Sequence, residues 1–212
     1  MAIKYTMDGN EHTPCLVLAH GAGASSRSEW MNVMTSLLVA QGICVVRFDF
    51  PYMSIREQTG VKRPPDRMPV LQAHYHQLLV ELDRPVIIGG KSMGGRVASL
   101  LAAEDTKEYV RGCVCLGYPF HPNKKPDALR IAHWSSMSMP LLIVQGERDA
   151  MGNRQEVATY GLEGKAEWCW LPDGDHDLKP RKRSGFTFEQ HMEQAAVTVA
   201  AFVKQYGEST VE

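Results

Sequence analysis

Short apolar runs alternate along the chain with longer segments in which apolar residues recur every three or four positions. Six runs are apolar at nearly every position: 15–21, 44–50, 85–90, 110–119, 140–146 and 166–172. Near-continuous apolar runs of this length are typical of parallel strands that are buried on both faces of a sheet. Residues 2–7 are a candidate for an additional edge strand.

Helical periodicity fills the gaps between these runs, at 28–41, 68–83, 93–104 and 186–206. Strands that alternate with helices predict a parallel sheet with right-handed crossovers and helices on both faces. We therefore expect one three-layer α/β domain over residues 1–212. The proline-rich and charged segments 50–69 and 118–140 are expected to be irregular. Both follow predicted strand ends, where open α/β sheets place their ligand sites.

Composition narrows the possible partners. The 212 residues are 44% hydrophobic and 22% charged, with a formal net charge of −1, so no overall field favours nucleic acid or an anionic membrane. No apolar run reaches the roughly 18 residues of a membrane span, and the first residues lack an apolar signal core. We expect a cytoplasmic protein that acts on a small molecule. Five cysteines without C-x-x-C spacing are expected to be buried reduced thiols: Cys15, Cys44, Cys113, Cys115 and Cys169.

The stretch "VIIGGKSMGGRVA" at 86–98 fits two chemistries. Its Gly-Lys-Ser resembles the end of a phosphate-binding loop, which requires another glycine five residues before the glycine of this triplet. That position is Pro85, and Val86, Ile87 and Ile88 are poor residues for a loop that wraps an anion. The spacing therefore excludes a phosphate loop.

A dinucleotide-binding fingerprint is the second alternative. "LVLAHGAGASS", with Asp49 further along, resembles such a motif. The stretch lacks the third glycine, which allows close packing between helix and strand. This partial pattern is a weak signal.

The same 86–98 stretch also fits the G-x-S-x-G nucleophile elbow, with Ser92 as the nucleophile. A strand runs into the motif and a helix follows it, which is the context that the elbow requires. Gly90 and Gly94 remove side chains that would collide across the sharp turn. An ordinary strand-to-helix turn is the simpler explanation of the motif, so the rest of the chain must supply an acid, a base and oxyanion donors.

The expected acid and base follow Ser92 in the order that this class of site requires. Asp149 comes just beyond the run 140–146, and Glu147 is a competitor two residues earlier. His176 comes in a polar loop after the sixth run, among Asp173, Asp175 and Asp177. We predict a Ser92–His176–Asp149 triad.

The oxyanion hole requires two backbone donors. The N–H of Met93, directly after the nucleophile, is the first candidate. The N–H of Ala22, in the glycine-rich loop after the first long strand, is the second, and His20 is expected to brace that loop.

Taken together, "LVLAHGAGA", "RFDFPY", "GGKSMGGR", "QGERDAMG" and "GDHDLKPRKRSGFT" resemble the α/β-hydrolase superfamily over nearly the whole chain. The last block, with "FDFPY" and "KSMGGR", resembles a small lidless subfamily that is dienelactone-hydrolase-like and related to the testis-expressed and NSL-complex-subunit proteins. The resemblance implies a mostly parallel eight-stranded sheet with a minimal lid or none. Dienelactone hydrolases use cysteine as the nucleophile, whereas this chain has Ser92, so serine-based acyl transfer is the expected chemistry.

The predicted activity is hydrolysis of a small or accessible carboxylic ester or thioester, with no metal ion or organic cofactor. Tyr52 and Phe120 are candidate substrate contacts because they follow strand ends, although such aromatic residues also cover cores. The basic segment 179–183 either attracts an anionic substrate or is a solvated turn, and Lys91 has no predicted role. A non-catalytic binding module on the same fold is the alternative, because fold alone does not establish activity.

Overall fold

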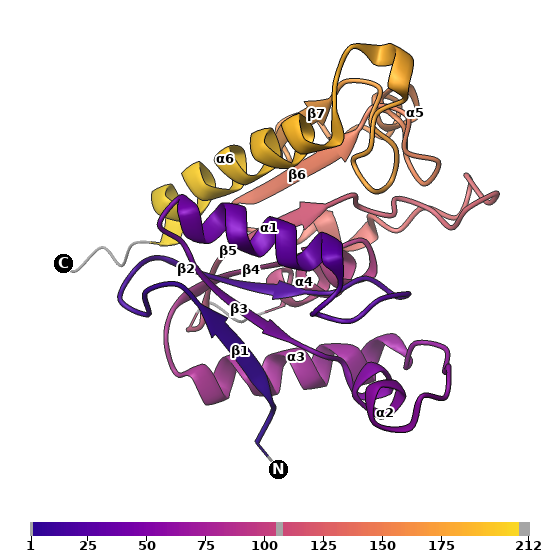
Figure 1. Cartoon of the computed structure of the whole chain (residues 1–212). Helices are drawn as coiled ribbons and strands as arrows, with labels where there is room; N and C mark the ends of the chain where they lie inside the picture. The colour runs from indigo at the N-terminus through magenta and orange to yellow at the C-terminus, as the bar shows by residue number, and fades with distance from the viewer. Residues whose placement is uncertain (1, 105–107, 208–212) are drawn as a thin grey trace.

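The computed structural model describes residues 2–104 and 108–207, in which a central sheet is covered by helices on both faces (Figure 1). The strands are β1 (Tyr5–Asp8), β2 (Cys15–Ala19), β3 (Cys44–Phe48), β4 (Val86–Lys91), β5 (Val110–Leu116), β6 (Leu141–Gly146) and β7 (Glu167–Leu171). The α-helices are α1 (Glu29–Ala40), α2 (Pro51–Thr59), α3 (Met68–Leu82), α4 (Met93–Ala102), α5 (Arg154–Val157) and α6 (Phe188–Gly207). Two short 3₁₀ helices are η1 (Ala132–Ser135) and η2 (Lys182–Ser184).

The sheet has the strand order β1-β3-β2-β4-β5-β6-β7. Strands β2 to β7 are parallel to their neighbours, and β1 pairs antiparallel with β3 at the edge. The six predicted strands and the predicted edge strand are therefore confirmed. The expected eighth strand is wrong for the described residues, which form seven, because nothing pairs with the outer edge of β1 there.

Two apolar clusters lie on opposite faces of the sheet because successive side chains of a strand point to opposite sides. In β5, Cys113 and Cys115 join the cluster beneath α3 and α4, whereas Val114 and Leu116 join the one beneath α1 and α6. Burial on both faces explains why the strands are apolar at nearly every position. All five cysteines are buried free thiols, as expected.

The segment 50–69 is less irregular than predicted, because it contains α2. Pro51 occupies the first turn, where its missing N–H is not needed, and Gly60 ends the helix with a left-handed φ of 72°. The segment between β5 and β6 contains only η1, which is compatible with a minimal lid. Figure 1 shows these segments, with the loop after β2, at the edge of the sheet where the strands end.

Candidate active site

Ser92 sits on a strained turn between β4 and α4. Its φ of 51° and ψ of −116° are outside the regions that most non-glycine residues adopt. A Cβ on Gly90 would lie 2.4 Å from the carbonyl carbon of Gly94, and one on Gly94 would lie 2.6 Å from the Ala19 oxygen. Gly95, the next residue, is equally constrained, since a Cβ there would lie 2.7 Å from the Gly90 oxygen. The glycines therefore allow the turn to close against β2 and β4.

Gly90→Ala is expected to lower the free energy of unfolding by about 3 kcal/mol, because the new methyl group meets backbone that cannot move aside. Gly23→Ala is the matched control, since a Cβ there meets nothing within 4 Å. It should change stability by less than about 0.5 kcal/mol. Urea unfolding of both variants measures the difference, and equal stabilities would contradict the steric argument.

Ser92, His176 and Asp149 form one chain of hydrogen bonds. The Ser92 hydroxyl donates to His176 Nε2 across 2.8 Å, and His176 Nδ1 donates to Asp149 Oδ2 across 2.7 Å. These directions follow from the carboxylate, which can only accept. The three residues lie in the turn after β4 and in the loops after β6 and β7, which meet at one edge of the sheet because these strands are parallel.

The Asp149 carboxylate is completely buried and held by further donors. Oδ2 also accepts a hydrogen bond of 2.8 Å from Gln145 Nε2, and Oδ1 accepts one of 2.8 Å from the Met151 N–H. Gln145 is itself buried, and its side-chain oxygen accepts from the Tyr118 N–H at 2.7 Å. Gln145 is not predicted from the sequence. The one feature that could indicate its role is that it is a polar residue within the apolar run of β6.

The competing acidic residues are engaged elsewhere. Glu147 accepts a hydrogen bond of 2.6 Å from Arg154. Asp173 pairs with Arg181 and Arg148, and the Arg181 side chain holds the pKa of the Asp173 carboxyl far below its usual range. Of Glu147, Asp149 and Asp173, the structure brings Asp149 into contact with His176.

The loop after β2 holds its carbonyl groups away from Ser92. The Gly21 oxygen accepts from His20 Nδ1 at 2.7 Å, and the Ala22 oxygen accepts from the Tyr52 hydroxyl at 2.9 Å. Arg56, also on α2, donates to the Gly23 oxygen at 2.9 Å. In a trans peptide the N–H points opposite to the carbonyl, so the Ala22 N–H faces away from His20. Ala22 also lines the cavity beside Ser92.

Met93 is the first residue of α4, where backbone N–H groups have no acceptor within the helix. The helix dipole adds partial positive charge at this end. The geometry therefore fits both predicted oxyanion donors.

His20 is completely buried and bridges two segments. Its Nε2 accepts from the Phe50 N–H at 3.1 Å, while its Nδ1 donates to Gly21. Burial lowers the pKa of His20 from its ordinary value of 6.5, although its hydrogen bond to Gly21 and the nearby Asp49 oppose this. The neutral ring is therefore the form that braces the loop.

This bridge predicts a pH dependence of stability. With a lowered pKa in the folded protein, His20 contributes stability that is fully present above about 6.5 and declines as the pH falls toward the folded-state value, because the unfolded chain then binds more protons. The free energy of unfolding should therefore decrease between pH 7.5 and 5.5, and less steeply in His20→Gln. Denaturant titrations at both pH values measure this, and equal slopes would contradict the role of His20.

Tyr52 and Phe120 do not lie on the wall of the cavity beside Ser92. Tyr52 is 2% exposed and holds the loop carbonyl described above, and burial raises the pKa of its hydroxyl, which stays a donor. Phe120 is completely buried, packs edge-to-face against Tyr118 with ring centroids 4.9 Å apart, and lies where a Cβ on Gly152 would clash. Both side chains support the loops of the site from within the core.

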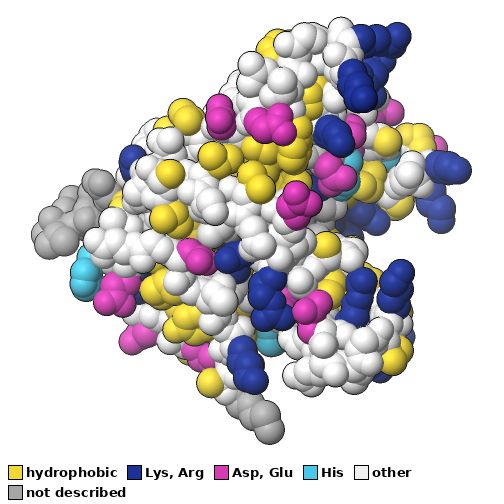
Figure 2. Space-filling view, in the orientation of Figure 1, with side chains coloured by type: hydrophobic (Ala, Val, Ile, Leu, Met, Phe, Trp, Pro, Cys, Tyr) yellow, Lys and Arg dark blue, Asp and Glu magenta, His cyan; other side chains and the backbone are white. Residues whose placement is uncertain are grey.

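A cavity of about 270 Å³ opens beside Ser92 and His176. Its remaining lining residues come mainly from the loop after β2 and from α1: Gly21, Ala22, Gly23, Ala24, Ser28, Trp30, Met31, Lys91 and Asp177. The loop that carries Asp177 continues into the exposed basic residues of 179–183. Figure 2 shows Lys and Arg side chains gathered along the edge of the molecule where the strands end. Among the described residues, no group of three or more His, Cys, Asp or Glu side chains is placed to hold a metal ion.

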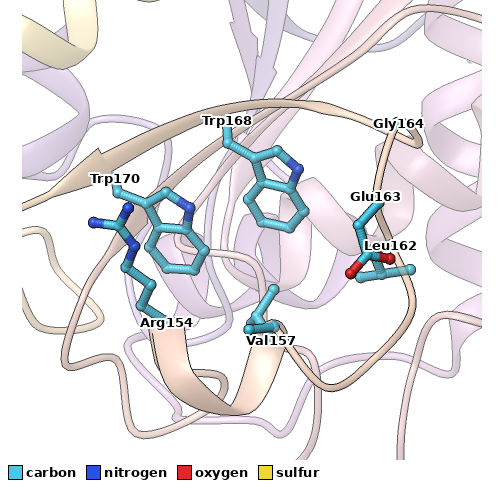
Figure 3. A pocket seen from close by; sticks show the side chains of 8 residues that line it. Arg154, Val157, Leu162, Glu163, Gly164, Trp168 and Trp170 are labelled. Atoms are coloured by element: carbon cyan, nitrogen blue, oxygen red, sulfur yellow. The ribbon is translucent and has the colours of Figure 1, made fainter.

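A second pocket, of about 260 Å³, lies beside β7, and none of Ser92, His176 and Asp149 lines it (Figure 3). Trp168 and Trp170 form one side of it, with parallel rings 5.3 Å apart, and the Arg154 guanidinium lies 5.8 Å from the Trp170 ring. Val157 and Leu162 form the apolar floor. Because it contains no nucleophile, we place the candidate chemistry at the cavity beside Ser92.

The fold is that of α/β hydrolases. The chain belongs to the α/β hydrolase domain family, whose model matches residues 12–204. Within the described residues, no helix is both long and apolar enough to cross a membrane.

Solved structures with the same fold include several hydrolases. Dienelactone hydrolase from Anabaena variabilis is 22% identical with a TM-score of 0.64, covering 96% of this chain and 90% of its own. The esterase domain of a Rhodothermus marinus protein is 17% identical with a TM-score of 0.68, covering 98% and 100%. The monoacylglycerol lipase of Paleococcus ferrophilus is 15% identical with a TM-score of 0.67, covering 97% and 100%. At these identities the similarity concerns the fold.

Proposed function

We propose that the chain, as one domain over residues 1–212, is a serine hydrolase that cleaves a small or accessible carboxylic ester or thioester. The observation that carries the proposal is the continuous hydrogen-bond chain from Ser92 through His176 to buried Asp149. Membership of the α/β hydrolase family adds support, as do neighbours named esterase and lipase.

In the first half-reaction, Ser92 Oγ attacks the acyl carbonyl while His176 Nε2 takes its proton. The oxyanion that forms is stabilised by the N–H groups of Met93 and Ala22. His176 then gives its proton to the departing alkoxide or thiolate, which leaves an acyl group on Ser92. In the second half-reaction His176 activates water, which attacks the acyl-enzyme and releases the acid and free Ser92.

The cavity supports a small acyl group. Its volume of about 270 Å³ is below the roughly 300–1,000 Å³ of sites that bind drug-sized ligands. We also propose a cytoplasmic enzyme of the small lidless, dienelactone-hydrolase-like subfamily. The motifs support this, as does the segment between β5 and β6, in which η1 is the one helix described.

A fluorophosphonate probe followed by peptide mapping tests the nucleophile, with Ser92 as the expected site of labelling. If Ser92 stays unlabelled while a control esterase reacts, the enzyme hypothesis fails and a binding module is favoured. A panel of p-nitrophenyl esters and acyl-CoA thioesters then defines the substrate class. Acetyl substrates should exceed octanoyl substrates in kcat/KM, and the reverse order would contradict the small pocket.

A further inference from the structure

Lys91 is a buried lysine directly beside the nucleophile. Its side chain is 9% exposed, although lysine is almost never buried without a partner. Its ammonium donates to the backbone oxygen of His176 across 2.8 Å and lies 3.0 Å from Asp177 Oδ1. The last residue of β4 is therefore tied to the loop that carries the histidine.

Trp30 of α1 completes this connection. The Lys91 ammonium lies 5.7 Å from the centre of the Trp30 ring, and Trp30 Nε1 donates to the Asp177 oxygen across 3.1 Å. On the other side, Gly117 adopts a φ of 64°, and a Cβ there would lie 2.6 Å from the His176 oxygen. The backbone at His176 is therefore held between β4, α1 and the end of β5.

We propose that Lys91 is a positioning residue for His176, which fixes the histidine loop through the His176 carbonyl and balances the charge of Asp177 beside the imidazole. The proposal deepens the function proposed above and rests on it. Lys91 acts through His176 and does not itself take part in bond making.

The charges around His176 make this balance measurable. Asp149 approaches Nδ1 from the loop after β6, and Asp177 and Lys179 lie in the histidine's own loop. Burial raises the pKa of the Asp177 carboxyl, but Lys91 outweighs it, with smaller contributions from His176 and Lys179, and the net pKa is lowered. Lys91 thus supplies a positive charge from β4 that favours an ionised Asp177 and opposes a charged imidazole.

Removing the ammonium leaves Asp177 unbalanced, so protonated His176 is favoured. In Lys91→Met, we expect the midpoint of the His176 imidazole titration to rise by about one pH unit. In Lys91→Met/Asp177→Asn it should return to within about 0.3 units of the starting protein, because both charges are then gone. Asp177→Asn alone should lower the midpoint, and this exposed site tolerates the change without unfolding.

The titration is followed by NMR in a Ser92→Ala background, which requires no turnover. The acid limb of kcat/KM against pH, measured with Ser92 present, should move in the same directions. In Lys91→Met and in Lys91→Met/Asp177→Asn, kcat should fall about ten- to a hundredfold, because the hydrogen bond from Lys91 to the His176 carbonyl is lost. Lys204→Met, at an exposed position in the last turn of α6, is the matched control, and it should change neither the titration midpoint nor kcat.

A midpoint that stays fixed in Lys91→Met and in Asp177→Asn overturns the charge balance, and an unchanged kcat overturns the anchoring. A loss of kcat with unmoved midpoints in all variants identifies a merely structural lysine. If the starting protein neither labels at Ser92 nor turns over esters, the proposed function fails. The NMR result then still decides whether Lys91 sets the charge state of His176.

Discussion

Ser92→Ala is expected to lower ester turnover by at least about a thousandfold, because no other group then forms the acyl-enzyme. The Ser92 hydroxyl donates to His176 in a cavity bounded by the glycine-rich loop. Alanine removes the proposed nucleophilic oxygen and leaves the proposed oxyanion donors, the N–H groups of Met93 and Ala22, in place. The residual rate therefore reports what the donors achieve without the nucleophile. Initial rates with p-nitrophenyl acetate measure the loss.

The matched control is Ser135→Ala, at an exposed serine of η1 whose hydroxyl donates to the Ala132 oxygen within its own turn. It should retain full turnover and labelling. Denaturant unfolding of Ser92→Ala should show that the fold is kept. Turnover that persists within tenfold of the starting protein would show that Ser92 is not the nucleophile.

Asp149→Asn is expected to lower turnover by about 10⁴-fold, as in sites where the acid fixes the histidine tautomer. Three groups donate to the Asp149 carboxylate: His176 Nδ1, Gln145 Nε2 and the Met151 N–H. An amide nitrogen cannot accept from them, so at least one donor loses its partner. If the amide nitrogen faces His176, the proton of the imidazole moves from Nδ1 to Nε2. A protonated Nε2 cannot accept the Ser92 proton.

Glu147→Gln is the control for this prediction, because Glu147 bonds to Arg154 at the surface. It should retain turnover within about twofold. Labelling of Asp149→Asn by the fluorophosphonate should slow in parallel with turnover. Full activity in Asp149→Asn, with a large loss in Glu147→Gln, would move the acid to Glu147.

The strands could be predicted from sequence because burial on both faces leaves an apolar residue at nearly every position. The helices α1, α3, α4 and α6 could be predicted because each has one apolar face. Helix α2 could not be predicted, because its mean hydropathy is low and prolines lie in and near it. Its local sequence indicates an irregular segment, whereas packing of Tyr52 and Met53 in the core stabilises a helix. The eighth strand was inferred from resemblance, and no apolar run of this chain corresponds to it.

That Ser92, Asp149 and His176 lie together could be predicted, because each is in the turn or loop that follows a strand, and parallel strands end at the same edge of the sheet. Gln145 and Lys91 could not, since each is one polar residue within or beside an apolar strand, and its partner is distant in sequence. The position of Tyr52 after a strand predicts a substrate contact. In the structure its hydroxyl instead donates to the Ala22 oxygen and supports the loop after β2 from beneath.

The sequence by itself determined the order of strands and helices, the turn that exposes Ser92, and the residues available as base and acid. These features depend on neighbours in the chain, on glycines at 90 and 94, and on the direction in which parallel strands end. Only the tertiary structure decided that Asp149 faces His176, that the Gly21 and Ala22 carbonyls turn away, and that Lys91 reaches the histidine loop. Those outcomes depend on side chains from β4, β6 and α2 meeting at one edge of the sheet. Contacts between side chains that are distant in sequence produce no periodic pattern along the chain.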